Sequence, residues 1–323
     1  MLRILVIGGT GFIGSAFAGV ALAKGHAVRV LSRHSPDRQN KSHSIGAIEY
    51  VSGDISDVEV LDRATADVDI CLHAASTTVP FSANNFMELD VNDNLIGSLR
   101  AFQSCVRSNV KRVILVSSGG TVYGRPRNLP IVEAHPTDPI SAYGIVKLAI
   151  EKYLALFGET YGLDYRIARL SNPYGPKQNT ASGQGVVAAF VEQILNGKTL
   201  LLMGDGTVVR DFVYIDDVAD ALLRLCSHPG PSRIFNVGSG AGTSIGKIVA
   251  SIADLTQLEP NVEYRESRKF DVLKNVLSCE LARRELQWSA TTTLDAGLRA
   301  AIDAKKHELE RIKAHAPSRP GNH

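Results

Sequence analysis

A glycine-rich turn directly after the first apolar run is the feature that most constrains how this chain folds. The run Arg3–Ile7 leads into Gly8-Gly9-Thr10-Gly11-Phe12-Ile13-Gly14, and a helical stretch, Phe12–Lys24, begins inside the turn. Three glycines at this spacing permit a tight turn, close approach of the backbone to a pyrophosphate and close packing of helix against strand. The unpaired N–H groups and the positive dipole end of the helix then face the phosphates. We therefore predict a dinucleotide site, with a ligand-free glycine turn as the alternative. Its predicted contacts are Gly8, Thr10, Gly11, Phe12, Ile13 and Gly14.

The first half of the chain alternates short apolar runs with helical stretches. Runs that are rich in Val, Ile and Leu and bounded by Gly, Asp or Ser are typical of buried parallel strands. They are Arg3–Ile7, Ala27–Leu31, Ile48–Val51, Val68–His73 and Arg112–Ser117. The helical stretches are Phe12–Lys24, Glu59–Ala66, Glu88–Ser108 and Ala142–Thr160. This order predicts an α/β fold with a doubly wound parallel sheet, the Rossmann arrangement.

The alternation ends after Asn172, where a Gly-, Ser- and Gln-rich loop leads into shorter segments. We expect residues 1–172 to form the dinucleotide-binding domain and residues 173–306 to form a smaller C-terminal α/β lobe that binds the substrate. The stretch 212–237, with a helix at Asp216–Cys226 and a strand at Ile234–Val237, is expected to return to the first sheet. Residues 307–323 are charged and then polar with Pro and Gly, so we expect a frayed tail.

Composition excludes several classes of function. The 35 Lys and Arg residues against 33 Asp and Glu residues leave no basic excess for a nucleic-acid backbone. No apolar run is long enough to span a membrane, and the first residues lack the pattern of a signal peptide. The four cysteines form no CxxC pair, and neither they nor the histidines have metal-ligand spacing. We therefore expect a cytoplasmic protein without a metal, a nucleic-acid partner or a membrane anchor.

The end of the second predicted strand bears on the choice of cofactor. NAD sites usually place Asp or Glu there to accept a hydrogen bond from the ribose 2′-hydroxyl. This chain has Leu31-Ser32-Arg33-His34 instead, and a hydroxyl beside a guanidinium suits a 2′-phosphate. The sequence therefore favours NADP over NAD, with Ser32 and Arg33 as contacts. The alternative is that Arg33 is a solvated loop residue and that NAD is used.

Tyr143 and Lys147 lie four residues apart at the start of a predicted helix, so their side chains share one face. An ammonium group beside a phenol lowers its pKa and allows a phenolate to act as a general base near neutral pH. We predict that these two residues are the catalytic pair. Hydroxyl groups follow the strand that ends near Ser117, in Ser117-Ser118-Gly119-Gly120-Thr121-Val122-Tyr123-Gly124.

With these motifs the chain resembles the extended short-chain dehydrogenase/reductase family, and within it the NAD-dependent nucleotide-sugar epimerases and dehydratases. The resemblance runs from Ile4 to about Leu298. It implies that Asn172 touches the sugar nucleotide and that Arg210 clamps its diphosphate, although Arg210 has an ion pair with Asp211 or Asp216 as an alternative. Arg268 and Asp271 fall where a second arginine and a ribose-contacting Asp are expected, with a solvated Arg268 as the alternative. The further cofactor contacts are Asp54, Ile55, His73, Ala74, Ala75 and Ser117.

One position departs from the family pattern, because Gly119 stands where many members carry Ser or Thr. We predict that Thr121, or otherwise Ser118, hydrogen-bonds the reacting sugar oxygen beside Tyr143. Family dehydratases need an additional acid and base at this element, whereas this chain has Gly119-Gly120 and no acid before Glu133. Oxidation followed by re-reduction needs no further acid, so epimerisation is the simplest chemistry that remains.

The resemblance thus implies a nucleotide-sugar epimerase in which Tyr143 takes the proton of the C4 hydroxyl while hydride moves to the nicotinamide. Lys147 holds the ribose hydroxyls, and the 4-keto sugar takes the hydride back on its other face. An NADPH-dependent reductase of a keto sugar or another carbonyl is the alternative; a dehydratase or a non-catalytic dinucleotide-binding module ranks lower. The family often pairs its two long helices across a two-fold axis, so a homodimer is expected.

Overall fold

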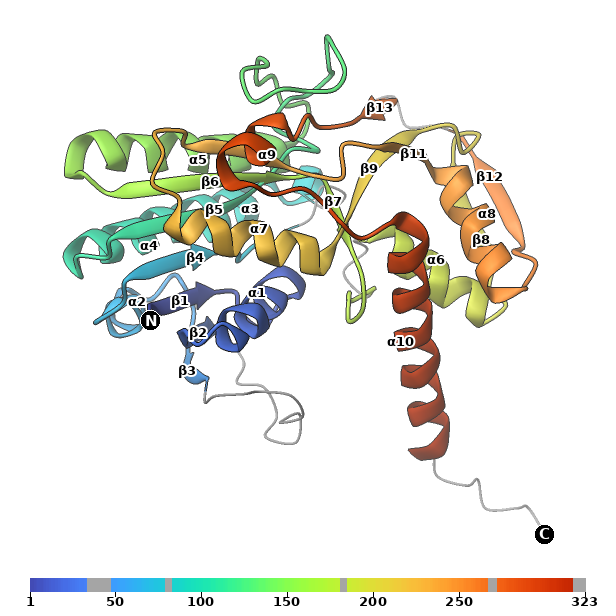
Figure 1. The fold of residues 1–323 in the computed structure, drawn as a ribbon, viewed down its shortest axis with the longest axis horizontal. Helices are drawn as coiled ribbons and strands as arrows, with labels where there is room; N and C mark the ends of the chain where they lie inside the picture. The colour runs from blue at the N-terminus through green and yellow to red at the C-terminus, as the bar shows by residue number, and fades with distance from the viewer. Residues whose placement is uncertain (34–47, 79–82, 181–184, 267–271, 316–323) are drawn as a thin grey trace.

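A seven-stranded parallel sheet forms the larger part of the molecule, with a smaller lobe attached to one side of it (Figure 1). The structure is a computed structural model, and it describes residues 1–33, 48–78, 83–180, 185–266 and 272–315. The strand order is β10-β6-β5-β4-β1-β2-β3. These strands are β1 (Arg3–Ile7), β2 (Ala27–Ser32), β3 (Glu49–Ser52), β4 (Ile70–His73), β5 (Arg112–Ser118), β6 (Asp164–Leu170) and β10 (Ile234–Val237). The predicted doubly wound sheet is confirmed.

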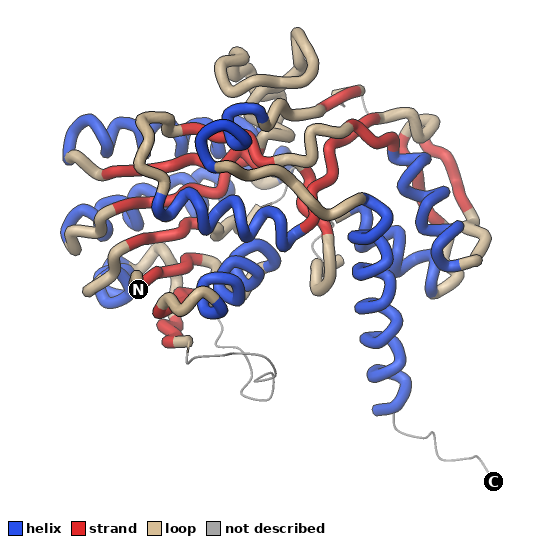
Figure 2. Tube along the Cα trace, in the orientation of Figure 1, coloured by secondary structure: helices blue, strands red, loops and turns tan. Residues whose placement is uncertain are grey.

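Helices cover both faces of this sheet, because each strand carries apolar side chains on both of its faces. On one face, Ile4 and Val6 of β1 pack with α1 (Phe12–Ala23) and α7 (Ile215–Ser227). On the other face, Leu5 and Ile7 pack with α2 (Val58–Thr65), α4 (Gly97–Arg107) and α5 (Ala142–Tyr161). Figure 2 shows the resulting layers of helix, sheet and helix.

The strand order reverses at β1, which pairs in register with β2 on one side and β4 on the other. The connections leaving these neighbouring strands therefore diverge and open a crevice beyond the carboxyl ends of the strands. The glycine turn after β1 and the segment Ala74–Ala75 after β4 both lie at this crevice.

The smaller lobe is built from two short sheets and three helices. Strand β9 (Val209–Tyr214) pairs with β7 (Asn172–Tyr174), β11 (Gly242–Ser244) and β13 (Lys274–Asn275). Strands β8 (Leu200–Met203) and β12 (Val262–Arg265) form a separate pair. Helices α6 (Val186–Leu195), α8 (Ile245–Thr256) and α10 (Leu294–His315) pack around a third apolar core. Helix α9 (Glu280–Leu286) lies against β10.

The chain returns to the large sheet from within the lobe. After β9, helix α7 crosses back over α1, and β10 pairs in parallel with β6. The expected return of residues 212–237 therefore begins only at α7, because β9 stays in the sheet of the smaller lobe. Asp211, which is fully buried, connects the two parts: its carboxylate accepts hydrogen bonds from the backbone N–H groups of Ser239, Gly240 and Leu277.

Two sequence expectations differ from the structure. The single helix expected at Glu88–Ser108 is three segments: α3 (Met87–Asp90), a π-helical segment η3 (Val91–Ile96) and α4, preceded by a short 3₁₀ turn η2 (Ala83–Asn85). Of the tail expected to fray over residues 307–323, the part up to His315 is helical, and residues 316–323 lie outside the described ranges. Pairs such as Lys305–Glu308 and His307–Glu310, three residues apart on the helix, support this extension.

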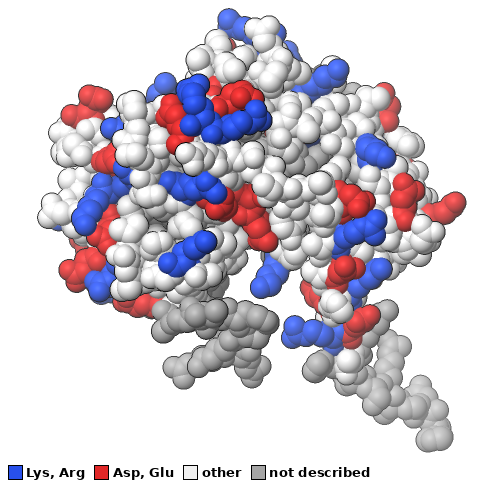
Figure 3. Space-filling view, in the orientation of Figure 1, with Lys and Arg blue, Asp and Glu red and all other residues white. Residues whose placement is uncertain are grey.

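The surface carries charges of both signs, interspersed over the face shown in Figure 3. In the described ranges, no helix combines the length and the apolar character that a membrane span requires. The searched part of the chain also brings no three His, Cys, Asp or Glu side chains together as a metal-binding group.

Candidate active site

The glycine turn forms a close-packed bend between β1 and α1. Gly8 has φ +84°, and a Cβ there would lie 2.8 Å from the backbone N and Cα of Ala75. A Cβ on Gly14 would lie only 2.3 Å from the carbonyl oxygen of Gly8. Gly11 caps helix α1 without a side chain, so no side-chain oxygen occupies the N–H groups of the first turn. This arrangement fits a pyrophosphate, because uncapped N–H groups and the helix dipole attract anions.

The predicted adenosine end of the site lies at the edge of β2 and β3. Arg33 is exposed, and its carbonyl oxygen accepts a hydrogen bond from the Ser52 hydroxyl. Asp54 lies just beyond the end of β3, and the backbone N–H of Ser56 and then the charge of Arg33 lower the pKa of its carboxyl. The side chain of Ile55 packs against Gly97 at the start of α4. The structure therefore brings Arg33 and Asp54 together at one rim of the crevice.

Two predicted cofactor contacts turn their side chains away from the crevice. The ring of His73 is buried; its Nε2 lies 3.0 Å from the Ser98 hydroxyl, and its edge packs against Phe102. Burial, together with the charge of Lys147, lowers the pKa of His73 to about 3, so the ring is neutral. The Ser117 hydroxyl donates to Glu151. Both side chains therefore face the helices that cover the sheet, and the cofactor contacts expected from His73 and Ser117 stay predictions.

The catalytic pair predicted at Tyr143 and Lys147 lies on the first turns of α5. Ser141 caps this helix, its hydroxyl accepting a hydrogen bond from the N–H of Gly144 at 3.2 Å. The Nζ of Lys147 lies 5.6 Å from the centre of the Tyr143 ring and 3.4 Å from the carbonyl oxygen of Val116. The lysine side chain is buried, so its ammonium group spans the gap between α5 and the carboxyl end of β5.

The protonation of this pair differs from the sequence expectation. Burial raises the pKa of Tyr143 to about 12; a hydrogen bond with Ser76 lowers it, and the charge of Asp90 raises it. Burial likewise lowers the pKa of Lys147 to about 8, against the charges of Asp90 and Glu151, which raise it. Desolvation therefore dominates both groups, and the lysine neighbour alone does not activate the tyrosine.

The two candidate hydroxyl groups lie just beyond β5. Thr121 packs against the start of α5, because a Cβ added to Gly144 would lie 2.9 Å from the Thr121 carbonyl oxygen. The Thr121 hydroxyl is buried and has no hydrogen-bond partner among the described residues. An unpaired buried hydroxyl is costly, so this group is poised for a ligand oxygen. Ser118 ends β5, and its carbonyl oxygen accepts the N–H of Thr121 at 3.2 Å.

A buried ion pair behind the catalytic pair is absent from the sequence predictions. Glu151 lies one helical turn after Lys147, and Arg169 reaches it from β6 with an Nη2–Oε2 distance of 2.6 Å. The guanidinium also stacks over the Tyr123 ring, 4.8 Å from its centre. The Tyr143, Lys147, Glu151 spacing of four residues is the sequence signal that could have identified Glu151.

The two predicted substrate residues that the structure describes lie on neighbouring strands of the smaller lobe. Asn172 begins β7, and its Nδ2 donates to the carbonyl oxygen of Asp211 at 3.0 Å. Arg210 lies on β9, and its Nη1 donates to the carbonyl oxygens of Val209 and Val272 at 2.9 and 2.6 Å. Arg268 and Asp271 lie outside the described residues.

Asn275 is a further polar group that sequence reasoning missed. It lies on β13 beside Arg210, and its Nδ2 donates to the carbonyl oxygen of Gly119 at 3.2 Å. Its buried Oδ1 has no partner among the described residues. A Cβ at position 119 would lie 2.6 Å from the Leu277 side chain and 3.1 Å from the carbonyl oxygen of Arg169, so Leu277 would have to shift to admit it.

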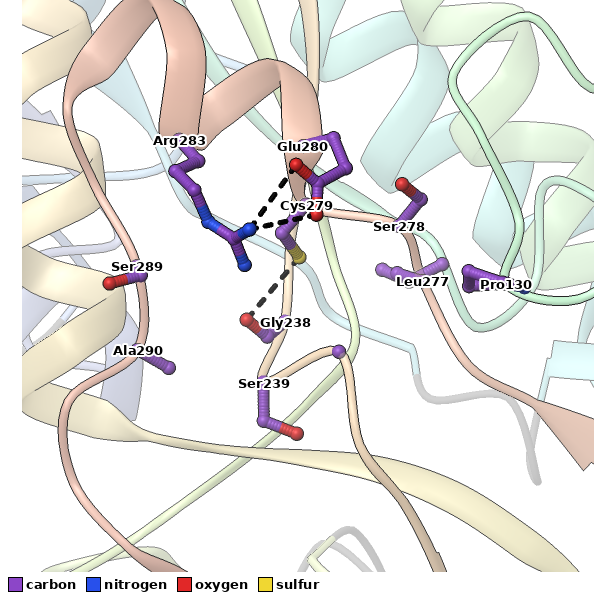
Figure 4. A pocket seen from close by; sticks show the side chains of 11 residues that line it. Pro130, Gly238, Ser239, Leu277, Ser278, Cys279, Glu280, Arg283, Ser289 and Ala290 are labelled. Atoms are coloured by element: carbon purple, nitrogen blue, oxygen red, sulfur yellow. Dashed lines mark hydrogen bonds and ion pairs between the residues drawn. The ribbon is translucent and has the colours of Figure 1, made fainter.

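A separate cavity of about 380 Å³ opens near the start of α9. Figure 4 shows the Arg283 guanidinium turned towards Glu280 and the Cys279 thiol donating to the carbonyl oxygen of Gly238. None of the predicted site residues lines this cavity. It is therefore distinct from the crevice that holds the candidate catalytic groups.

Known proteins are similar to this chain along most of its length. Residues 4–238 match the NAD dependent epimerase/dehydratase family. A relative from Mycolicibacterium smegmatis named UDP-glucose 4-epimerase is 34% identical over 307 residues, covering 94% of this chain and 98% of the relative.

Two solved structures extend the comparison to three dimensions. The Thermotoga maritima UDP-glucose 4-epimerase with UDP-glucose has a TM-score of 0.89 at 32% identity, covering 95% of this chain and all of that one. The Thermus thermophilus UDP-glucose 4-epimerase complex with NAD has a TM-score of 0.86 at 32% identity, covering 94% and 99%. The chain described here therefore belongs to the NAD-dependent epimerase/dehydratase family.

Proposed function

We propose that this chain interconverts the C4 epimers of a nucleotide-diphosphate sugar with a bound nicotinamide cofactor. The observation that carries the proposal is the convergence of Tyr143, Lys147 and the unpaired Thr121 hydroxyl at the carboxyl end of β5. Relatives that cover nearly the whole chain are named UDP-glucose 4-epimerase, and solved neighbours hold UDP-glucose or NAD.

Each residue of the site has a defined task in this proposal. The Tyr143 phenolate removes the proton of the sugar C4 hydroxyl, and Thr121 donates or accepts a hydrogen bond at the same oxygen. Lys147 binds the cofactor ribose and stabilises the phenolate. Arg210 is proposed to bind the diphosphate with the same guanidinium that now contacts two carbonyl oxygens. A nicotinamide bound in the crevice would supply the hydride acceptor and donor for the sugar carbon.

The surroundings of the strand end argue against a dehydratase. Gly119 and Gly120 carry no acid, and the first acid after them, Glu133, accepts a hydrogen bond from the backbone N–H of Asn236 at 2.9 Å. Burial raises the pKa of Glu133, and its carboxylate is already engaged at the edge of β10. It is therefore poorly placed to eliminate water from a sugar.

The test is incubation of the purified protein with UDP-, GDP- and dTDP-sugars, without added cofactor, followed by mass spectrometry and NMR. We expect a product of unchanged mass with inverted C4. Turnover only on stoichiometric consumption of NADPH would establish the reductase instead, and loss of water would establish a dehydratase.

The role of the hydroxyl groups is tested by comparing Thr121→Val with Ser118→Ala. We expect Thr121→Val to lower turnover about 10- to 100-fold, because it removes one hydrogen bond at the reacting oxygen, and Ser118→Ala to have the smaller effect. Unchanged turnover in both variants would refute a third catalytic hydroxyl.

A preference for NADP is proposed from Arg33, which is exposed at the rim where a 2′-phosphate would lie. The charge of Arg33 acts on Asp54. The Asp54 carboxylate would favour NAD instead, because it can accept a hydrogen bond from a ribose hydroxyl. Calorimetric titration with both cofactors decides between them, and Arg33→Ala should weaken NADP binding selectively. Tighter binding of NAD to the unaltered protein would overturn the assignment.

We propose a homodimer that forms through the two long helical segments named in the sequence analysis, which are α3 to α4 and α5 in the structure. Both segments expose apolar side chains, which are Met87 and Val91 on the first and Ile145, Tyr153 and Leu156 on α5. Light scattering should give twice the chain mass, and Leu156→Glu should shift it to the monomer. A monomeric unaltered protein would contradict this.

A further inference from the structure

Two buried carboxylates lie near Lys147, one on its own helix and one on a segment packed against that helix. Asp90 ends α3, just before the π-helical segment η3, and is 1% exposed. Glu151 lies on α5, one turn after the lysine, and is 2% exposed. A buried carboxylate is costly unless a cation and hydrogen-bond donors compensate it. The partners of each carboxylate therefore decide which one belongs to Lys147.

Glu151 is already neutralised by Arg169. The Nε of Arg169 lies 3.1 and 3.2 Å from the two oxygens of Glu151, and its Nη2 lies 2.6 Å from one of them. The Ser117 hydroxyl supplies a further donor. Both members of this pair are buried, and their opposite charges cancel within the core.

Asp90 has only neutral donors among the described residues. Its Oδ1 accepts hydrogen bonds from the Thr78 hydroxyl and from the Asn94 Nδ2, both at 2.7 Å. Its Oδ2 is buried and has no partner in the described part of the chain. No ion pair to Asp90 occurs within these residues, so its charge must be balanced through space.

The π-helical turn explains how the chain holds a carboxylate at this depth. Asn94, within η3, donates to Asp90 and to the Thr78 hydroxyl, while its Oδ1 accepts the backbone N–H of Thr77. The wider turn thus fastens α3 to the segment after β4, on the side that faces α5. π-helical turns of this kind are frequent at functional sites.

Among the described residues, Lys147 is the buried cation that has no ion pair of its own. The groups that act on Lys147 are Tyr143 and Glu151 on its own helix, His73 at the end of β4 and Asp90. His73 is neutral, and Glu151 is paired with Arg169 on β6. We propose that Asp90 is the counter-ion of Lys147, a positioning residue that keeps the lysine protonated beside Tyr143. The proposal rests on the assignment of Tyr143 and Lys147 as the catalytic pair.

The electrostatics of the site agree with this role. Burial lowers the pKa of Lys147 to about 8, and Asp90 is the stronger of the two charges that raise it. The same carboxylate raises the pKa of Tyr143. Removing its charge therefore lowers the pKa of both groups, which shifts both limbs of a pH–rate profile in the same direction.

The first test is a double-mutant cycle on thermal stability, which needs neither substrate nor turnover. Asp90→Asn is compared in the unaltered chain and in a Lys147→Met background. In the Lys147→Met background the Asp90 carboxylate has no counter-ion, so its replacement by Asn should help stability there. We expect the change in Tm caused by Asp90→Asn to be more favourable in that background than in the unaltered chain, by about 2 °C or more. If a single variant fails to fold while the double variant folds, that result supports the proposal in the same way. Equal changes in both backgrounds would overturn the proposal, whatever the enzyme turns over.

The second test is the pH profile of kcat with a nucleotide sugar. Asp90→Asn should shift both limbs to lower pH by about one unit or more. Thr78→Val loosens the same hydrogen-bond network but keeps the charge, so its limbs should stay in place. Glu88→Gln, an exposed carboxylate on the same helix, is the matched control and should match the unaltered enzyme. An unshifted Asp90→Asn profile, or an equal shift in Thr78→Val, would refute the counter-ion role.

Discussion

The buried pair of Arg169 and Glu151 gives the sharpest prediction for stability. Their side chains are 3% and 2% exposed, so solvent screens neither charge. Arg169→Met keeps the apolar stem but leaves the Glu151 carboxylate with one hydroxyl donor, that of Ser117. Removing one partner of a buried ion pair costs about 3–5 kcal/mol. The stacking of the guanidinium on Tyr123 is lost as well, which favours the upper half of this range.

The expected loss converts to a measurable change in Tm. An unfolding entropy of about 2.1 cal/mol/K per residue gives roughly 0.7 kcal/mol/K for this chain, and hence a Tm that is lower by about 4–7 °C. Differential scanning calorimetry and urea denaturation measure it. Arg283→Met, which breaks an exposed pair with Glu280, is the control and should change stability by less than about 0.5 kcal/mol.

A second variant separates an uncompensated charge from lost packing. Arg169→Met with Glu151→Leu removes both charges, so it should recover most of the stability that Arg169→Met loses. A loss below about 1 kcal/mol in the single variant would refute the reasoning. So would a double variant that is no more stable than the single one.

Three further outcomes are expected. Gly14→Ala should weaken cofactor binding at least about 10-fold by calorimetry, because its Cβ meets the Gly8 carbonyl, whereas Gly19→Ala, which meets nothing within 4 Å, should not; equal binding in both would contradict the packing argument. Tyr143→Phe should reduce kcat about 100-fold or more while nucleotide affinity is retained, and unchanged turnover would remove Tyr143 as the base. Because burial lowers the pKa of Lys147 to about 8, the unfolded chain binds more protons than the folded chain between about pH 8 and 10.5. The Lys147 contribution to stability therefore rises with pH in this window, by at most about 1.4 kcal/mol per unit, and Lys147→Met should lack this rise when denaturation is compared at pH 7.5 and 9.5.

The fold was largely predictable because its signals are local. The apolar run Arg3–Ile7 and the glycines after it specify a strand, a turn and a helix within a few residues, and the structure has all three. The break in the long helix was not predictable, because Asn94 makes it by bonding to Thr77 and Thr78, which are distant in sequence. A periodic pattern cannot reveal a turn that is widened by a tertiary contact.

The candidate site was predictable in its residue types and less so in their orientations. The spacing of Tyr143 and Lys147 placed both on one helix, and the structure brings them together. For His73 and Ser117, motif position alone could not show whether the side chain faces the crevice or the helices covering the sheet. The pKa of Tyr143 could not be predicted either, because the burial that raises it depends on the packed structure rather than on its neighbour in sequence.

The late return of the chain to its first sheet has a consequence for synthesis on the ribosome. Strands β1 to β6 lie within residues 3–170, whereas β10 lies at 234–237 and α7, which covers α1, lies at 215–227. While residues 171–237 are still being made, the edge of β6 is unpaired and the apolar face around Phe17 is uncovered. Such long-range pairings form slowly, and until they form they leave unpaired strand edges and apolar surface that are prone to aggregate. Nascent chains arrested near residue 172 should therefore recruit chaperones, and those arrested well beyond residue 237 should release them.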